Sequence, residues 1–269
     1  MPKHHTLDNQ NADAVFNMKF DAARDDKPCY FEVKDRDNTH LIFDDSLSKN
    51  TIIIGVRSSR NLVLDGIFLK EVTKGSIVLN ILDNSSVNIV FCEASYLPFE
   101  INLEVNLLGE SASIDIKMAC IGLENSKKVF NLFVNHKARH TTSNIDLKGV
   151  AKDSSSIKFL PVSNIELNTP NCEAHQDSRI ISLSDQSVGT ILPILTISNN
   201  EVVASHSACL GSIKDDEIFY LLSRGIPKGK AAALIVKGII NNAFNSLIDT
   251  EEKQKFKIVY ERGIENGNI

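Results

Sequence analysis

The sequence repeats a short motif in which an acidic residue opens a small polar stretch and an apolar residue follows six positions later: DNSSVNI (83–89), ESASIDI (110–116), DSSSIKF (153–159) and DQSVGTI (185–191). Successive copies begin 27, 43 and 32 residues apart. Irregular multiples of a short unit are typical of a β-solenoid with insertions, because each coil buries its inward face only against neighbouring coils. A sandwich of antiparallel hairpins produces similar strings, so the spacing alone leaves both architectures open.

Runs of alternating apolar and polar residues extend on both sides of this motif, from about Tyr30 to Ala204. They include IIIGV (52–56), SIVLNIL (76–82) and VFNLFVN (129–135). A period of two residues is the pattern of a strand that is buried on one side. The sequence therefore predicts a mainly β core of many short strands.

The period changes after this core, and the last part of the chain is predicted to be helical. In KDDEIFYLLSRGIP (214–227) three acids stand where a helix N-terminus favours negative charge, while Arg224 and Gly225 mark its end. Pro227 can begin a second helix, which is expected to extend to Ile248. Its predicted buried face contains Ala232, Ile235, Ile239 and Ala243.

We divide the chain into three parts on this basis. Residues 1–29 form an N-terminal segment, loose over its first dozen residues and with a brief amphipathic helix expected over Ala12–Arg24. Residues 30–212 form the β core, and residues 213–269 form a C-terminal helical subdomain. Within that subdomain, 251–262 is expected to add a short charged helix before a frayed tail over 263–269.

Composition excludes several classes of function. A net charge of -5 lacks the basic excess of a nucleic-acid-binding surface. The N-terminus has no apolar run after its first basic residue, and no stretch approaches the roughly 20 apolar residues of a membrane span. We therefore expect a cytoplasmic protein that binds neither nucleic acid nor membrane.

Histidines and cysteines provide the candidate ligands. The five cysteines include no CxxC pair, and no phosphate-binding or common hydrolytic motif is present. His136 and His140 are four residues apart, but they lie in sequence typical of strand and loop, where that spacing does not make them converge. His206 precedes the change from strand to helix, with Cys209 three positions later, and imidazole and thiolate both bind iron.

Three blocks around these residues resemble the SufB/SufD family, in the same order. They are HTTSNIDLKGVAKDSSSIKF (140–159), EAHQDSRIISLSDQSVGTILPILTI (173–197) and SHSACLGSIKDDEIFYLLSRGIPKGKAA (205–232). The resemblance implies a right-handed parallel β-helix (β-solenoid) followed by a small α-helical subdomain. Ser187 stands where the SufB type carries a cysteine, and Ser205 and Ser207 flank His206 where SufB has glutamates, so these departures favour a SufD-like chain.

The resemblance also implies a function and partners. Family members belong to the Suf iron–sulfur cluster assembly complex, SufBCD, in which SufB and SufD pair through their β-helices and each contacts a SufC ATPase through its C-terminal helices. This chain would then be a non-catalytic scaffold with no permanently bound cofactor, sharing a transient iron–sulfur cluster with SufB. A homodimer is expected to be possible in isolation. Family members also carry an N-terminal helical domain, so this chain is expected to be a core-only member.

The resemblance assigns roles to particular residues. His206 matches the family histidine that faces nascent cluster at the SufB interface, and Cys209 stands where the family usually has threonine. Arg224, Gly225 and Ile226 match the end of the helix that faces SufC.

Two other functions remain as alternatives. One is a purely structural interaction module in which His206 is inert. The other is a β-solenoid enzyme acting on carbohydrate, which normally needs aromatic platforms for sugar rings, whereas this chain has no tryptophan.

Overall fold

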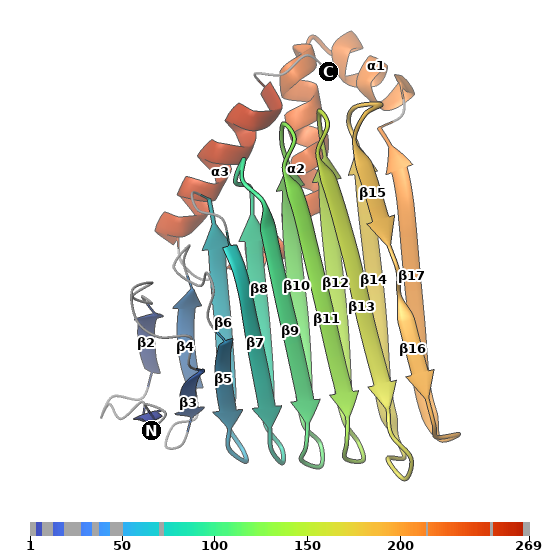
Figure 1. Ribbon diagram of the computed structural model, residues 1–269. Coiled ribbons are helices and arrows are strands. Elements are labelled where there is room, and N and C mark those ends of the chain that lie inside the picture. The colour runs from blue at the N-terminus through green and yellow to red at the C-terminus, as the bar shows by residue number, and fades with distance from the viewer. Residues whose placement is uncertain are drawn as a thin grey trace.

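The chain passes back and forth between two β-sheets, each built of parallel strands, as the computed structural model shows (Figure 1). The structure describes residues 4–6, 13–18, 28–33, 38–43, 51–69, 73–213, 215–247 and 250–265. Within these ranges every strand pairing is parallel. Consecutive strands from β1 to β15 belong to opposite sheets, which is the topology of a β-solenoid and excludes the sandwich of antiparallel hairpins.

Up to β15, the odd-numbered strands form one sheet and the even-numbered strands form the other, and β16 and β17 then add one strand to each. The odd-numbered sheet contains β1 (His4–Thr6), β3 (Cys29–Val33), β5 (Thr51–Val56), β7 (Thr73–Ile81), β9 (Phe99–Leu107), β11 (Lys127–His136), β13 (Ser156–Ile165) and β15 (Val188–Ile191), with β16 (Ile194–Ile197) also paired to β13. The even-numbered sheet contains β2 (Asp13–Met18), β4 (Asn38–Phe43), β6 (Asn61–Phe68), β8 (Ser86–Glu93), β10 (Ser113–Gly122), β12 (Thr142–Ala151) and β14 (Cys172–Ser182), and it ends at β17 (Val202–Ser212).

The irregular spacing of the sequence motif follows from this winding. Asp83 and Glu110 lie in the turns before β8 and β10 of the even-numbered sheet, whereas Asp153 and Asp185 precede β13 and β15 of the odd-numbered sheet. The intervals of 27 and 32 residues are therefore single coils, and the interval of 43 includes a change of sheet. The acids also join neighbouring coils, since Asp83 Oδ1 accepts the N–H of Glu110 at 2.7 Å.

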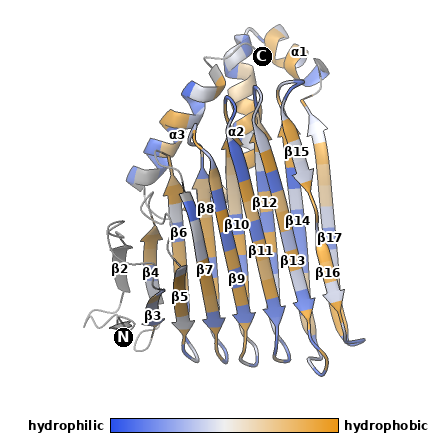
Figure 2. Cartoon of the chain, in the orientation of Figure 1, coloured by the Kyte–Doolittle hydropathy of each residue, from blue (hydrophilic) through white to orange (hydrophobic). Residues whose placement is uncertain are grey.

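Alternation along each strand builds an apolar interior between the two sheets, and Figure 2 shows it as hydrophobic and hydrophilic bands. Inward side chains at equivalent positions stack from coil to coil because parallel strands in register project the same way. Phe130 and Phe159 are one such in-register pair, with ring centroids 5.4 Å apart, and Phe99 of the same sheet and Phe68 of the opposite sheet extend the row of ring contacts at 5.1 Å. These contacts add to the burial of each ring and hold the register between coils.

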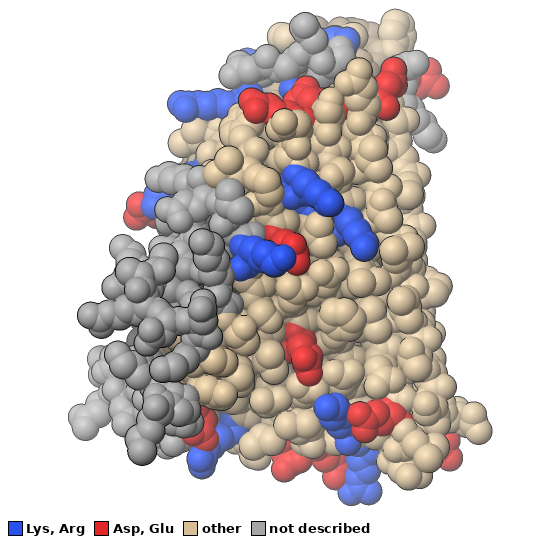
Figure 3. All heavy atoms as spheres, viewed as in Figure 1, with Lys and Arg blue, Asp and Glu red and all other residues tan. Residues whose placement is uncertain are grey.

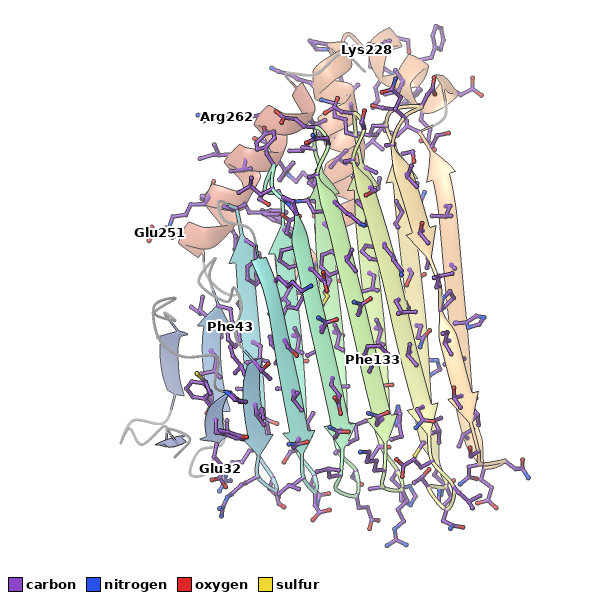
Figure 4. The ribbon with its side chains drawn as sticks, viewed as in Figure 1. Glu32, Phe43, Phe133, Lys228, Glu251 and Arg262 are labelled. Carbon is purple, nitrogen blue, oxygen red and sulfur yellow. The ribbon has the colours of Figure 1, made fainter. Side chains whose placement is uncertain are left out.

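Three helices follow the solenoid, as the sequence predicted: α1 (Asp215–Ser223), α2 (Lys228–Ser246) and α3 (Thr250–Glu265). Helices α2 and α3 cover the outer face of the even-numbered sheet, where Val90, Ala119 and Ile121 pack against Val236 and Phe256. In Figure 4, Lys228 marks the start of α2, and Glu251 and Arg262 lie near the two ends of α3.

The buried face of α2 differs from the predicted one. Val236 and Ile240 are buried, together with Ala232 and Ala243, whereas the predicted Ile235 and Ile239 are only partly covered. The two faces are offset by one residue, so the prediction found the stripe but set its centre incorrectly. The predicted tail was also too long, because α3 continues through Gly263, whose carbonyl accepts a hydrogen bond from Lys152 Nζ at 2.8 Å.

The helix expected over Ala12–Arg24 is wrong. Residues Asp13–Met18 form β2, which pairs in parallel with β4 from Asn38 to Phe43, and His4–Thr6 form β1. The first edge of a solenoid offers unpaired backbone groups, and pairing with them outweighs a weak local helix propensity. The strands of the solenoid thus begin before Tyr30; the remainder of the expected helix lies outside the described residues.

In the described part of the chain, no helix is both long and apolar enough to cross a lipid bilayer.

Candidate interaction site at the open end of the solenoid

The solenoid is uncovered at its C-terminal end. Strand β17 pairs with β14 along eleven residues, and no described strand pairs with its other edge. Two of its large apolar side chains are exposed, Leu210 at 56% and Val203 at 58%. A long strand edge with exposed apolar side chains is a typical pairing surface for another chain.

The odd-numbered sheet contributes exposed apolar residues to the same end. Strands β15 and β16 pair with the two halves of β13, and Leu192 and Pro193 separate them. Proline lacks the N–H that a continuous ladder needs, so it divides this last strand in two. Four large apolar side chains of this segment are exposed: Val188, Leu192, Ile194 and Ile197. We call these four residues, with Val203 and Leu210 of β17, the terminal surface.

His206 lies in the middle of β17, at the terminal surface. Its Cα pairs in register with that of Gln176 on β14, which is buried inside the solenoid. Partners in parallel strands project to the same face, so His206 belongs to the inward row of the last coil. It is exposed because no further coil covers it in the part of the chain that the structure describes.

Cys209 belongs to the opposite face of the same strand. It pairs in register with Arg179, and both line a groove of about 760 Å³ between the sheet and α2. An odd separation along a strand directs two side chains to opposite faces. The structure therefore does not bring His206 and Cys209 together.

Three charged residues that line this groove form ion pairs with one another. Lys148 Nζ lies 2.8 Å from Asp146 Oδ1 and 2.6 Å from Asp177 Oδ2. Burial alone would lower the pKa of Lys148, but its hydrogen bonds to the two carboxylates outweigh burial and raise that pKa.

The outer face of the odd-numbered sheet, at the front of Figure 3, carries few charges over the strands and more at the turns at its foot. Phe133 of β11 lies on this front face (Figure 4).

The predicted partner-binding residues lie at the end of α1. Gly225 has a φ of +80°, and the N–H of Ile226 returns to the carbonyl of Leu221 at 3.2 Å, closing the helix as such a glycine allows. Arg224 stacks over the ring of Tyr220, 5.3 Å from its centroid. Phe219 is 71% exposed, so α1 presents an uncovered aromatic surface.

Comparison with known proteins gives this arrangement a family. The protein-family model described as "SUF system FeS cluster assembly, SufBD core domain" matches residues 72–239, which is more than half of the chain. The chain belongs to the SufBD family. The resemblance in the three sequence blocks is thereby confirmed.

Curated relatives of this SufBD chain include SufD. The iron–sulfur cluster assembly protein SufD of Bacillus subtilis is 32% identical over 159 residues, which are 59% of this chain and 36% of that protein. An iron–sulfur cluster assembly SufBD family protein of Methanothermobacter thermautotrophicus is 29% identical over 133 residues, 49% of this chain and 32% of that one. The alignments thus cover about a third of these relatives' length.

One buried cluster in this SufBD core was not predicted. Lys128 on β11 and Glu93 on β8 are both fully buried, and Lys128 Nζ lies 2.6 Å from Glu93 Oε1. Lys128 also donates to the carbonyls of Ser95 and Leu97, at 2.8 and 2.6 Å. Burial raises the pKa of Glu93, and the ammonium of Lys128 opposes that rise. The only signal in the sequence was that Lys128 lies two residues before Phe130, so both side chains face the same, inward side of the strand.

Ligand-type side chains elsewhere in the SufBD core do not gather. Among the residues that the structure describes, no group of three or more His, Cys, Asp or Glu is placed to hold a metal ion. His136 is buried, with Nδ1 2.8 Å from Thr141 Oγ1 and Nε2 2.8 Å from Ser143 Oγ, whereas His140 lies in a turn with a φ of 59°. The two histidines do not converge, as expected for strand and loop.

The burial of His136 predicts a loss of stability in acid. Burial lowers its pKa to about 4, below the ordinary imidazole value of about 6.5. Between these pH values the unfolded chain binds a proton at His136 that the folded chain does not bind. The stability contributed by the neutral, buried His136 is therefore complete above about pH 6.5 and is lost as the pH falls toward 4. The free energy of unfolding should fall by roughly 3 kcal/mol across this window, measured by urea denaturation. The His136→Asn variant should show a smaller pH dependence; an equal dependence would refute the assignment.

Proposed function

We propose that this chain is a non-catalytic, SufD-like scaffold subunit that works in iron–sulfur cluster assembly in the cytoplasm. The observation that carries the proposal is the open terminal surface, where an unpaired strand edge presents His206 on the inward face of the last coil. A subunit of this kind contributes surfaces and ligands, and the chemistry of ATP belongs to a partner.

The partner proposed for the terminal surface is a SufB-like paralogue. A second solenoid of similar width can continue both sheets across the open end, satisfying the free edge of β17 and covering apolar residues such as Leu210 and Ile194. His206 would then lie between the two subunits. Imidazole is a competent iron ligand, so nascent cluster is the proposed cargo, shared transiently with the paralogue.

The partner proposed for α1 is a SufC-like ATPase. Phe219 and Tyr220 are exposed beside the turn of Arg224, Gly225 and Ile226, and exposed aromatic residues with an arginine are typical anchors of protein interfaces. Co-purification with SufB-like and SufC-like proteins tests both surfaces. A chain that binds neither protein would refute the proposal.

The role of His206 has its own test. His206→Ala is expected to slow cluster formation by the assembled complex roughly ten-fold or more, as the loss of a metal-directed residue does, while leaving subunit association intact. The matched control is His175→Ala, because His175 lies on the adjacent strand β14 and pairs with Ser205, one position away. Cluster formation is followed by its visible absorption after anaerobic addition of iron and sulfide.

The outcome separates the two remaining roles of the chain. If the wild type and His206→Ala form clusters at equal rates, the chain is a purely structural interaction module and its histidine is inert. Cys209→Ser is expected to retain cluster formation, because Cys209 lies on the other face of β17.

A further inference from the structure

Gln176 spans the interior of the solenoid directly below its open end. It lies on β14 and is 2% exposed. Its Nε2 donates to Ser163 Oγ of β13 at 2.8 Å and to the carbonyl oxygen of Ile194 of β16 at 3.2 Å. The carboxamide therefore connects the two sheets across the lumen.

These contacts leave the carbonyl oxygen of the side chain unsatisfied. The Ile194 carbonyl can only accept a hydrogen bond, so the nitrogen of the carboxamide must face it and the orientation of the amide is determined. Oε1 is buried and has no hydrogen-bond partner among the described residues. A buried acceptor without a donor is costly and uncommon in folded proteins, which points to a donor that this oxygen is built to receive.

His206 is the side chain in register with this oxygen. Gln176 and His206 pair through their Cα positions on adjacent parallel strands, and both belong to the inward row. Adjacent strands are about 4.8 Å apart, which is within reach of a glutamine and an imidazole. Below them the described part of the same row is apolar, and the pair interrupts it at its open end: the row continues through Ile145, Ile116, Ile89, Leu64 and Leu41.

We infer that Gln176 is a positioning residue for His206. The structure does not make this bond, but a turn of the His206 ring toward Oε1 lets Oε1 accept the N–H of one imidazole nitrogen, which holds the ring in one neutral tautomer and leaves the lone pair of the other nitrogen free at the terminal surface. Histidines that bind metals usually donate their second N–H to an oxygen in this way, and that bond determines which nitrogen is the ligand. The consequence for iron rests on the proposed function, whereas the hydrogen bond itself does not.

The tautomer of His206 in the complete, metal-free chain tests the hydrogen bond. Long-range proton–nitrogen correlation spectra of the ¹⁵N-labelled chain, recorded near pH 8.5 where an ordinary imidazole is neutral, report the ratio of the two tautomers; His206→Ala identifies the signal. Gln176→Met, which fills a similar volume without an acceptor, should change this ratio roughly five-fold, the effect expected of one hydrogen bond. A change below about two-fold would overturn the inference.

Two control variants separate the acceptor from its surroundings. Ser163→Ala removes one partner of the Gln176 amide but keeps Oε1, and Ser178→Ala removes a buried hydroxyl two residues further along the inward face of β14. Neither should change the tautomer ratio by more than about two-fold, since both keep the acceptor. A five-fold change in Ser163→Ala would assign the effect to the network and not to Oε1. If Gln176→Met does not fold, Gln176→Asn replaces it as the test. Its side chain is shorter by one methylene and so withdraws the oxygen, and it should give the same change in the tautomer ratio as predicted for Gln176→Met.

Cluster formation then distinguishes this inference from the proposed function. With both correct, Gln176→Met slows cluster formation in the complex and Ser178→Ala does not. If His206→Ala leaves cluster formation unchanged while the tautomer still depends on Gln176, the proposed function fails and the positioning hydrogen bond remains. If His206→Ala abolishes cluster formation but Gln176→Met does not change the tautomer ratio of His206, only the positioning role of Gln176 fails.

Discussion

Lys128→Met is expected to lower the free energy of unfolding by about 3–5 kcal/mol, the usual cost of leaving one partner of a buried ion pair alone. Lys128 and Glu93 are both 0% exposed, so no solvent can replace the ammonium beside the carboxylate. The substitution also removes the donor to the carbonyls of Ser95 and Leu97, in the segment that leads to β9. Urea denaturation followed by circular dichroism measures the change.

The chain provides a matched control at the preceding residue. Lys127 belongs to the same strand but is exposed on its outer face, so Lys127→Met should change stability by less than about 0.5 kcal/mol. In the double variant Glu93→Leu/Lys128→Met, the uncompensated carboxylate is absent, and part of the lost stability should return. A loss below about 1 kcal/mol for Lys128→Met alone would show that the pair is not essential to the coil.

Leu210→Glu is expected to weaken association with a SufB-like partner at least about a hundred-fold. Leu210 lies near the end of β17 and is exposed in this chain, but a paired solenoid would bury it in an apolar interface. Burying an unpaired carboxylate there costs several kcal/mol, and each 1.4 kcal/mol is ten-fold in affinity. Analytical ultracentrifugation or titration calorimetry with the partner measures the change.

Ile258→Glu is the control for that experiment. Ile258 has a similar exposed fraction but belongs to α3, which lies toward the N-terminal side of the solenoid, away from β17 (Figure 1). It should bind the partner with unchanged affinity. Equal weakening by both substitutions would point to a general effect of charge, and equal affinity of Leu210→Glu and the wild type would place the interface elsewhere.

The features that sequence reasoning found are those governed by neighbours along the chain. The period of two residues located the strands of the core, and the acids of the repeated motif lie in turns. The helix end at Gly225 follows from a left-handed φ that glycine adopts without strain. The errors lie where distant segments compete with local preference, as in β2, which pairs with β4 instead of forming a helix.

The candidate site shows the same division. His206 and Cys209 were both recognised as possible ligands, but their opposite orientation depends on β17 continuing as a strand to Ser212, against β14. Gln176 carried no signal at all, because a single glutamine in a strand does not reveal that its oxygen will be buried without a donor. Lys128 carried only the weak signal of its spacing from Phe130, and a lysine beside another lysine is usually at the surface.

The sequence by itself determined that this chain is a mainly β SufBD core with a helical C-terminus, because residue period, turn chemistry and three family blocks are properties of consecutive residues. Only the tertiary structure decided which residues meet. Winding through coils of differing length places Gln176 beside His206 and Glu93 beside Lys128, and no described strand pairs with the outer edge of β17. The physical reason is that register between coils is set by packing in the apolar interior and by hydrogen bonds between distant strands, neither of which is written in any one local segment.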